Sequence, residues 1–107
     1  MVIREWRGRA SRSNAALYPV HFRDVVVPDL RQVTGFLGAL LSQREMADRI
    51  EYLVVTQWAS MDAIKAFAGP MIEQAVVEPG AIRALESYDS TVTHYQVLEL
   101  VQPSGDS

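Results

Sequence analysis

Hydrophobic and polar positions follow two periods along this chain, and the order of those periods predicts the architecture. A period of two, typical of half-buried strands, occurs in four runs: Val2–Ala10, Phe36–Gln43, Ile50–Trp58 and Thr91–Val101. Helical spacing occurs over Ala15–Val27 and again from Met61. The order β-α-β-β-α-β predicts an α+β fold of ferredoxin-like topology, with one four-stranded antiparallel sheet and helices on one of its faces.

The first strand-like run carries apolar and charged residues on both of its faces. Arg4 and Trp6 lie on one face, whereas Ile3, Glu5 and Arg7 lie on the other. A strand with one face in water separates the two kinds of residue more cleanly. We therefore expect both faces of this strand to be partly buried.

Prolines interrupt the first helical run. Pro19 predicts a late start or a bend, because a proline beyond the first turn removes a hydrogen bond and crowds the preceding carbonyl. Pro28 predicts a break or a change of direction, followed by a short further turn over residues 29–33.

Caps and breakers also bound the second helical run. Ser60 is expected to cap its first turn, and Gly69 followed by Pro70 is expected to end it. A further helical piece is expected over residues 71–77, and a short turn over residues 81–86.

The chain has 107 residues and predicts a single domain over residues 1–101. Residues 102–107 contain Pro, Gly, Ser and Asp and are expected to be a disordered tail. A domain of this size buries only about two-thirds of the surface of its unfolded chain. We therefore expect self-association.

Charge and composition exclude several classes of protein. The net charge is −3 and the chain has no basic stripe, so no nucleic-acid partner is expected. The absence of cysteine excludes disulfides, zinc–thiolate sites and thiol nucleophiles. No apolar run approaches the roughly 20 residues of a membrane span, and no signal-peptide core is seen, so a cytoplasmic location is expected. No phosphate loop, nucleophile elbow or zinc-ligand pattern occurs, which disfavours a hydrolase, and neither a metal nor a cofactor is expected.

The chain resembles the antibiotic biosynthesis monooxygenase family of dimeric α+β barrels, over residues 2 to about 98. Five segments carry the resemblance: Arg4–Arg9, Pro28-Asp29, Ile50–Trp58, Ser60–Gly69 and Thr93–Val97. The junction in which the third strand ends at a Trp and a Ser starts the next helix is the most specific of them. The resemblance implies a homodimer whose sheets pack together, and a pocket between each subunit's helices and its own sheet.

Carried over to this chain, the resemblance implies an aromatic-lined pocket. Its substrate-binding residues would be Trp6, Tyr18, Phe22, Tyr52, Thr56, Trp58 and Phe67. Arg4 would stabilise a substrate anion, and His21 or His94 would be the catalytic base. Structural roles are the alternatives: core packing for the rings, an ion pair with a glutamate such as Glu99 for Arg4, and a surface or structural place for each histidine. The remaining acidic pairs, Glu73 with Glu78 and Asp24 with Asp29, are expected to lie on solvated helix faces.

Two active branches of the family differ from this chain at key positions. The haem-degrading branch uses a strand-one Asn, a Trp that ends strand three and a His on the following helix. Here Trp58 matches, but Trp6 replaces the Asn and no His occurs between Trp58 and Asp89. The quinone-forming branch also uses an Asn, and the only Asn of this chain, Asn14, falls between a strand and a helix.

The resulting expectation is a cofactor-independent monooxygenase that oxidises a small planar phenol or quinol. The alternative is a non-catalytic dimeric barrel that binds a small apolar ligand or has a structural or regulatory role, and a lyase or isomerase is a third possibility. An Arg4 that is buried without an acidic partner beside a cavity of a few hundred Å³ would favour a pocket. A space filled by Phe22, Phe67 and the tryptophans would favour the structural role.

Overall fold

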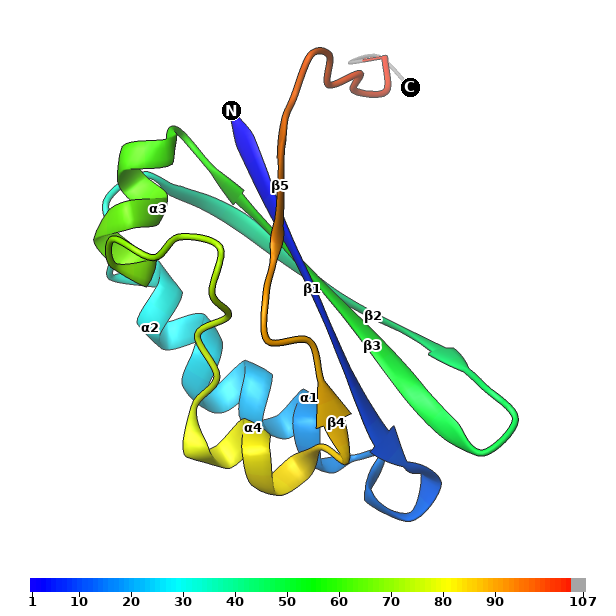
Figure 1. Cartoon of the computed structure of the whole chain (residues 1–107). Helices are drawn as coiled ribbons and strands as arrows, with labels where there is room; N and C mark the ends of the chain where they lie inside the picture. Colours follow the sequence, from blue (N-terminus) through cyan, green and yellow to red (C-terminus); the bar gives the residue numbers. More distant parts are fainter. Residues whose placement is uncertain (105–107) are drawn as a thin grey trace.

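The computed structural model describes residues 1–104, and its centre is one antiparallel sheet. The five strands are β1 (Val2–Ser11), β2 (Phe36–Glu45), β3 (Arg49–Trp58), β4 (Ser87–Tyr88) and β5 (Thr93–Gln96). They lie in the order β2-β3-β1-β4, and β5 also pairs with β1. Helices cover one face of this sheet, so the predicted α+β architecture is confirmed (Figure 1).

The strand predicted over Thr91–Val101 is present as the shorter β5, and β4, which pairs with the same strand β1, was not predicted. β4 pairs with Gly8 and Arg9, and β5 pairs with the first half of β1. Between them the chain leaves β1 and bonds to residues 73–75 instead. The Ala75 N–H donates to the Ser90 carbonyl at 2.9 Å, and the Val92 N–H donates to the Glu73 carbonyl at 2.9 Å. The hydrogen bonds to residues 73–75 therefore separate β4 from β5.

The first helical segment continues through both prolines. α1 (Leu17–His21) leads into a π-helical turn, η2 (Phe22–Val26), and then α2 (Val27–Arg31), after a short 3-10 turn, η1 (Arg12–Asn14). Pro19 lies in the first turn of α1, where its missing N–H has no helical partner to lose. Of the two outcomes predicted for Pro28, the break does not occur, because the wide π turn relieves the crowding that a proline causes one turn earlier.

α3 (Met61–Ala68) has the predicted ends. The Ser60 side chain accepts a hydrogen bond from the Ala63 N–H at 3.2 Å, and the helix stops at Gly69, whose φ is 82°. The predicted helix over residues 71–77 was wrong, because no helix forms there. The predicted short turn over residues 81–86 was also wrong, because α4 (Pro79–Ala84) lies there. We call residues 70–78, which cross from α3 to α4, the strap. No described helix is both long and apolar enough to cross a membrane.

The core lies between the helices and the sheet. The residues of β3 that face the helices, from Ile50 to Trp58, are all buried. One cluster surrounds Tyr18 and Tyr52, and a second surrounds Leu30 and Trp58. The side chains between these clusters form the site described below.

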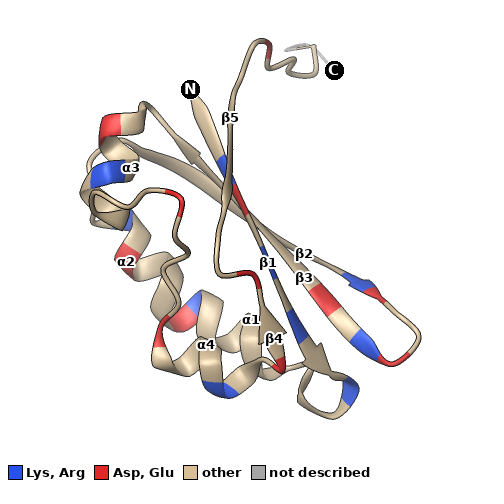
Figure 2. Ribbon diagram, viewed as in Figure 1, with Lys and Arg blue, Asp and Glu red and all other residues tan. Residues whose placement is uncertain are grey.

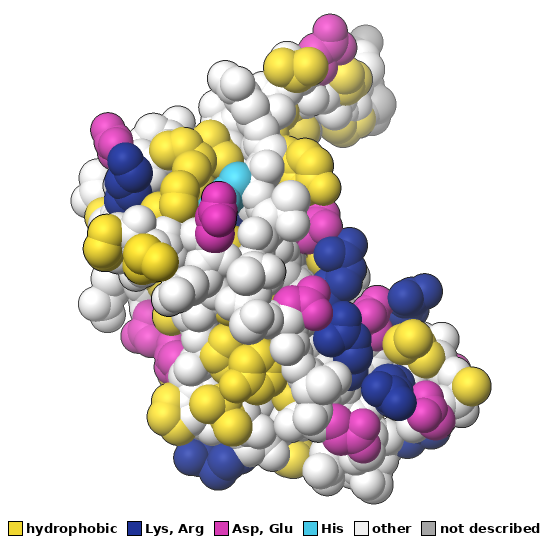
Figure 3. Space-filling view, in the orientation of Figure 1, with side chains coloured by type: hydrophobic (Ala, Val, Ile, Leu, Met, Phe, Trp, Pro, Cys, Tyr) yellow, Lys and Arg dark blue, Asp and Glu magenta, His cyan; other side chains and the backbone are white. Residues whose placement is uncertain are grey.

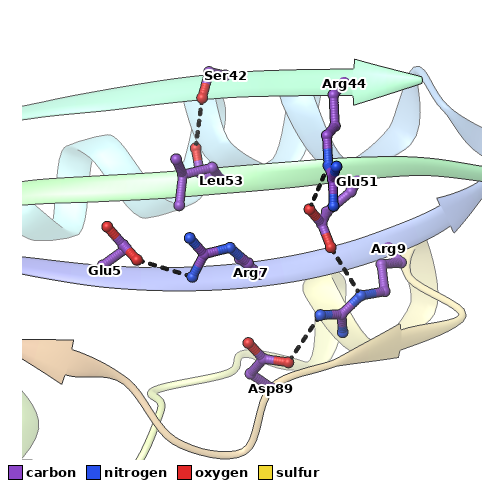
Figure 4. Close-up of polar contacts among 8 residues, drawn as sticks. All are labelled: Glu5, Arg7, Arg9, Ser42, Arg44, Glu51, Leu53 and Asp89. Atoms are coloured by element: carbon purple, nitrogen blue, oxygen red, sulfur yellow. Dashed lines mark hydrogen bonds and ion pairs between the residues drawn. The ribbon is translucent and has the colours of Figure 1, made fainter. Parts of the chain in front are cut away.

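No described helix covers the opposite face of the sheet, which we call the open face (Figure 1). On its two edge strands, Leu40 of β2 is 57% exposed and Tyr95 of β5 is 51% exposed. Charged side chains gather toward the β2–β3 hairpin (Figure 2). There Glu51 accepts hydrogen bonds from Arg44 at 2.9 Å and Arg9 at 3.2 Å (Figure 4). Ion pairing therefore accounts for the burial of Glu51.

Candidate functional site

A cavity of about 70 Å³ lies between the helices and the sheet. Every layer of the fold contributes to its wall. Its lining residues are Arg4, Trp6, Val54 and Thr56 from the sheet, Tyr18, His21, Val26 and Leu30 from the first helical segment, Phe67 from α3, Val76 and Glu78 from the strap, and Ala81 from α4.

Strand register places the polar groups of this cavity at opposite ends. Arg4 lies opposite Thr56, whereas Gly8 lies opposite Tyr52. Four residues of a strand separate these two levels by about 13 Å. The ring of Tyr18 packs on that of Tyr52, with centroids 5.3 Å apart. Arg4 therefore lies at one end of the cavity and Tyr18 at the other, with Trp6 between them.

Arg4 is a buried cation, only 5% exposed. Its Nη1 donates to the Ile72 carbonyl at 2.6 Å, and its Nη2 donates to the Gln74 carbonyl at 2.9 Å. Among the described residues no carboxylate pairs with it, so the alternative of a Glu99 ion pair is not formed. Burial lowers the pKa of Arg4 to about 10, and the side chain still carries its charge at neutral pH. Its positive charge is uncompensated by any described acid.

His94 positions Arg4. The Nη1 of Arg4 lies 3.0 Å from Nε2 of His94. Because a guanidinium can only donate, Nε2 must accept, and the imidazole is neutral. Burial, then the charge of Arg4, lowers the pKa of His94 against an opposing effect of Glu73. With its lone pair engaged, His94 is not available as a base, and it does not line the cavity.

His21 is the imidazole on the cavity wall. Its Nε2 atom is buried and has no hydrogen-bond partner among the described residues. Its ring packs 6.0 Å from that of Tyr18, centroid to centroid. Of the two candidate bases, His21 is therefore the one with a free nitrogen beside the cavity.

Glu78 is a wall residue that sequence reasoning placed on a solvated helix face, and that prediction was wrong. Burial raises its pKa, and the charge and hydrogen bond of Asp29 raise it further, while His21 opposes them. The pKa of Tyr18 is also raised, mainly by burial and then by Glu78. A proline followed by a glycine after Glu78 is a helix-start signal that could have marked its position at the N-cap of α4.

The structure brings six of the predicted residues to the cavity wall: Arg4, Trp6, Tyr18, His21, Thr56 and Phe67. Phe22, Tyr52 and Trp58 lie in the core instead. The indole of Trp58 donates to Oγ1 of Thr56 at 2.8 Å, and the Tyr52 hydroxyl donates to the Ala15 carbonyl. These rings support the wall from behind. The aliphatic wall residues missed by sequence reasoning carry no distinctive signal.

A sequence model of the family described as "Antibiotic biosynthesis monooxygenase" matches residues 1–70. This chain belongs to that family. The match contains β1, the first helical segment, the β2–β3 hairpin and α3, and it ends where the strap begins. No curated protein matches the chain.

Several solved structures share the family fold across nearly the whole chain. A putative antibiotic biosynthesis monooxygenase from Deinococcus radiodurans is 22% identical, with 98% of this chain and 100% of that chain covered and a TM-score of 0.64. SnoaB, a cofactor-independent oxygenase from Streptomyces nogalater, is 20% identical, with 95% and 98% covered and a TM-score of 0.58. The heme-degrader MhuD from Mycobacterium tuberculosis, solved with two hemes in its active site, is 22% identical, with 95% and 100% covered and a TM-score of 0.56.

The residues around the cavity do not fit a haem group. The wall offers one imidazole, His21, and α3 carries none. The second histidine has its Nε2 engaged by Arg4. The cavity itself, at about 70 Å³, is too small for a porphyrin. The described residues also contain no group of three or more side chains suited to a metal ion.

Proposed function

We propose that this protein is a monooxygenase that oxidises a small planar phenol or quinol without a bound cofactor. The observation that carries the proposal is Arg4, a buried cation with no described acidic partner on the wall of an aromatic-lined cavity. Its hydrogen bonds to two carbonyl groups and an imidazole leave its positive charge uncompensated, which favours a role in binding an anion. Family membership and the shared fold of SnoaB support the type of reaction.

The chemistry needs no external reductant. Deprotonation makes the ring electron-rich enough to transfer an electron to dioxygen. Where the ring system contains an activated CH₂ group, the overall reaction is CH₂ + O₂ → C=O + H₂O, and the substrate supplies all four electrons. Trp6 and Phe67 would enclose the ring, and Arg4 would stabilise the anion. His21 would accept the proton.

The size of the cavity requires the strap to move when a substrate binds. An engineered cavity of about 150 Å³ accommodates benzene, whereas this cavity holds about 70 Å³. The strap contains no helix or strand, and it contributes Val76 and Glu78 to the wall. Val76 is 46% exposed, so the cavity is separated from solvent by a thin layer there.

We also propose that two copies pack their open faces together, in the cytoplasm. Exposed Leu40 and Tyr95 lie on this face beside half-buried Ile3, Leu53 and Val55. Burying these side chains would give a small domain additional apolar contact. The family resemblance supports the same arrangement.

Oxygen consumption tests the proposed reaction. We expect uptake above the buffer rate with at least one of a panel of hydroquinones, naphthohydroquinones and anthrones. Arg4→Gln should lower that rate at least tenfold, Arg4→Lys should retain part of it, and Glu86→Gln, a change at an exposed site, should leave it unchanged. Circular dichroism checks that each variant is folded. No uptake with any compound would contradict the proposal.

The small volume of the cavity favours one alternative, a non-catalytic barrel that binds a small apolar ligand. The same panel separates the two functions. Quenching of tryptophan fluorescence by a compound that causes no oxygen uptake would support the alternative.

A further inference from the structure

The end of the cavity opposite Arg4 gathers four titratable groups from three segments of the chain. His21 comes from α1 and Glu78 from the strap, and both line the cavity. Asp29 comes from α2 and forms a hydrogen bond with Glu78. The phenol of Tyr18 packs beside His21 and lies near the charge of Glu78. This end therefore combines carboxyl groups with an imidazole, whereas the Arg4 end carries a cation.

Gly80 leaves space for the imidazole of His21. A Cβ atom at position 80 would lie 2.5 Å from Nδ1 and 2.7 Å from Cε1 of His21. The backbone does not need glycine there, because among the described residues only Gly35 and Gly69 have positive φ. Glycine in a helix costs up to about 1 kcal/mol relative to alanine. Close contact with the His21 ring explains its presence.

Asp29 lies beside Glu78, and its negative charge helps to raise the pKa of Glu78, because two negative charges side by side repel each other. Asp29 is exposed, so the pair connects the wall of the cavity to solvent. The charge of Glu78 also acts on His21. A proton that reaches His21 therefore meets a carboxylate that stabilises the imidazolium.

We propose that His21 and Glu78 form the proton-accepting end of the cavity, and that the ligand is a planar aromatic with an anionic oxygen group bound by Arg4 and a hydroxyl group at the opposite end. The hydroxyl O–H bond breaks, its proton binds Nε2 of His21, and the electron pair stays on the ligand oxygen. Conjugation spreads that charge through the ring toward Arg4. This inference rests on the cavity of the proposed function and specifies its substrate class.

The probe that tests it is 6-hydroxy-2-naphthoate, which carries its two oxygen groups at opposite ends of one ring system. We expect the hydroxyl group of the bound probe to ionise at a pH at least one unit lower than in the free probe. The absorbance of the phenolate form measures this ionisation. 2-Naphthoate and 2-naphthol, each lacking one group, should bind at least tenfold more weakly. Failure of the probe to bind, or equal affinity for all three compounds, would overturn the inference.

Variants test the role of each residue. His21→Gln and Glu78→Gln should each remove most of the shift in ionisation, whereas Glu86→Gln should retain it. Gly80→Ala alters no charge but displaces the His21 ring, so it should also reduce the shift. An unchanged shift in both His21→Gln and Glu78→Gln would overturn the inference.

The outcome separates this inference from the proposed function. If the hydroxyl group of the bound probe ionises at the lowered pH but no compound causes oxygen uptake, the monooxygenase reaction alone is contradicted. Oxygen uptake that persists at the full rate in His21→Gln and Glu78→Gln, with no shift in the ionisation of the probe, would contradict the inference alone.

Discussion

Glu51 and Glu78 lie on opposite sides of the same sheet, and their surroundings shift the pKa of the carboxyl group in opposite directions. On the open face, burial alone would raise the pKa of Glu51, but the hydrogen bonds and charges of Arg44 and Arg9 outweigh burial and lower it. On the cavity side, burial and Asp29 raise the pKa of Glu78. The open face pairs its carboxylate with cations, whereas the cavity side places its carboxyl group beside another acid.

The arrangement of the cations completes this comparison. Arg9 bridges Glu51 and Asp89 on the open face, at 3.2 Å and 3.0 Å (Figure 4). The cavity instead places Arg4 and Glu78 at opposite ends, where they do not pair. Basic and acidic side chains intersperse around the β2–β3 hairpin, while hydrophobic patches lie over the helices and the strap (Figure 3). Arg4 is held by two carbonyl groups and an imidazole and by no described carboxylate, so its net positive charge can attract an anionic ligand.

The largest expected effect is on the stability of the helix-covered side. Trp58 is fully buried and packs against Phe36 and Phe67, with ring centroids 5.5 Å and 5.4 Å away. Trp58→Ala should lower the free energy of unfolding by about 3–5 kcal/mol because it leaves a large cavity. Urea denaturation at fixed protein concentration measures the change. A loss under about 1 kcal/mol would show that this side does not carry the core.

The next effect concerns assembly through the open face. Leu40→Glu should weaken the proposed dimer at least about 100-fold, or about 2.7 kcal/mol, because it buries an unpaired charge twice in a symmetric interface. Sedimentation equilibrium measures the association. Ile82→Glu is the matched control, since Ile82 is 49% exposed on α4 and Leu40 is 57% exposed. Dimers of equal strength in both variants would exclude the open face as the interface.

The smallest effects compare the two carboxylates directly. The lowered pKa of Glu51 contributes stability at neutral pH that is lost as the pH falls through its folded pKa. The raised pKa of Glu78 contributes stability at low pH that is lost as the pH rises through its folded pKa. At pH 7, Glu51→Gln should therefore destabilise the fold by about 1–2 kcal/mol. Glu78→Gln should stabilise it by about 0.5–1 kcal/mol.

Thermal unfolding between pH 4 and pH 8 measures both variants. The effect of Glu78→Gln should shrink toward pH 4, where Glu78 gains a proton in both the folded and the unfolded state. The effect of Glu51→Gln should persist to lower pH, because the folded pKa of Glu51 is lowered. Changes of the same sign in the two variants at pH 7 would contradict the contrast between the faces.

Sequence periodicity predicts the long strands, because each depends on the alternation of its own residues. Ser60 and Gly69 likewise mark the ends of α3 through local capping. The strap could not be predicted in this way. Two of its carbonyl groups accept from the side chain of Arg4, and Glu73 and Ala75 bond to the backbone of residues 90–92, far along the chain. Long-range contacts therefore override its local helical pattern.

The residues of the candidate site show the same difference between local pattern and long-range contacts. Arg4 and Trp6 could be assigned to the cavity because a strand fixes which side each residue faces. His21 is the better candidate base because its Nε2 has no partner among the described residues, whereas Nε2 of His94 accepts from Arg4 on another strand. Neither fact can be read from the sequence. Glu78 was missed because the strap that places it was missed.

A crystal structure of the protein with 6-hydroxy-2-naphthoate tests most directly whether the cavity has two chemically distinct ends. We predict the naphthalene ring against Trp6, with the carboxylate bound by Arg4 and the hydroxyl oxygen within hydrogen-bond distance of Nε2 of His21. A ligand bound outside this cavity, or one whose hydroxyl group faces Arg4, would contradict the account.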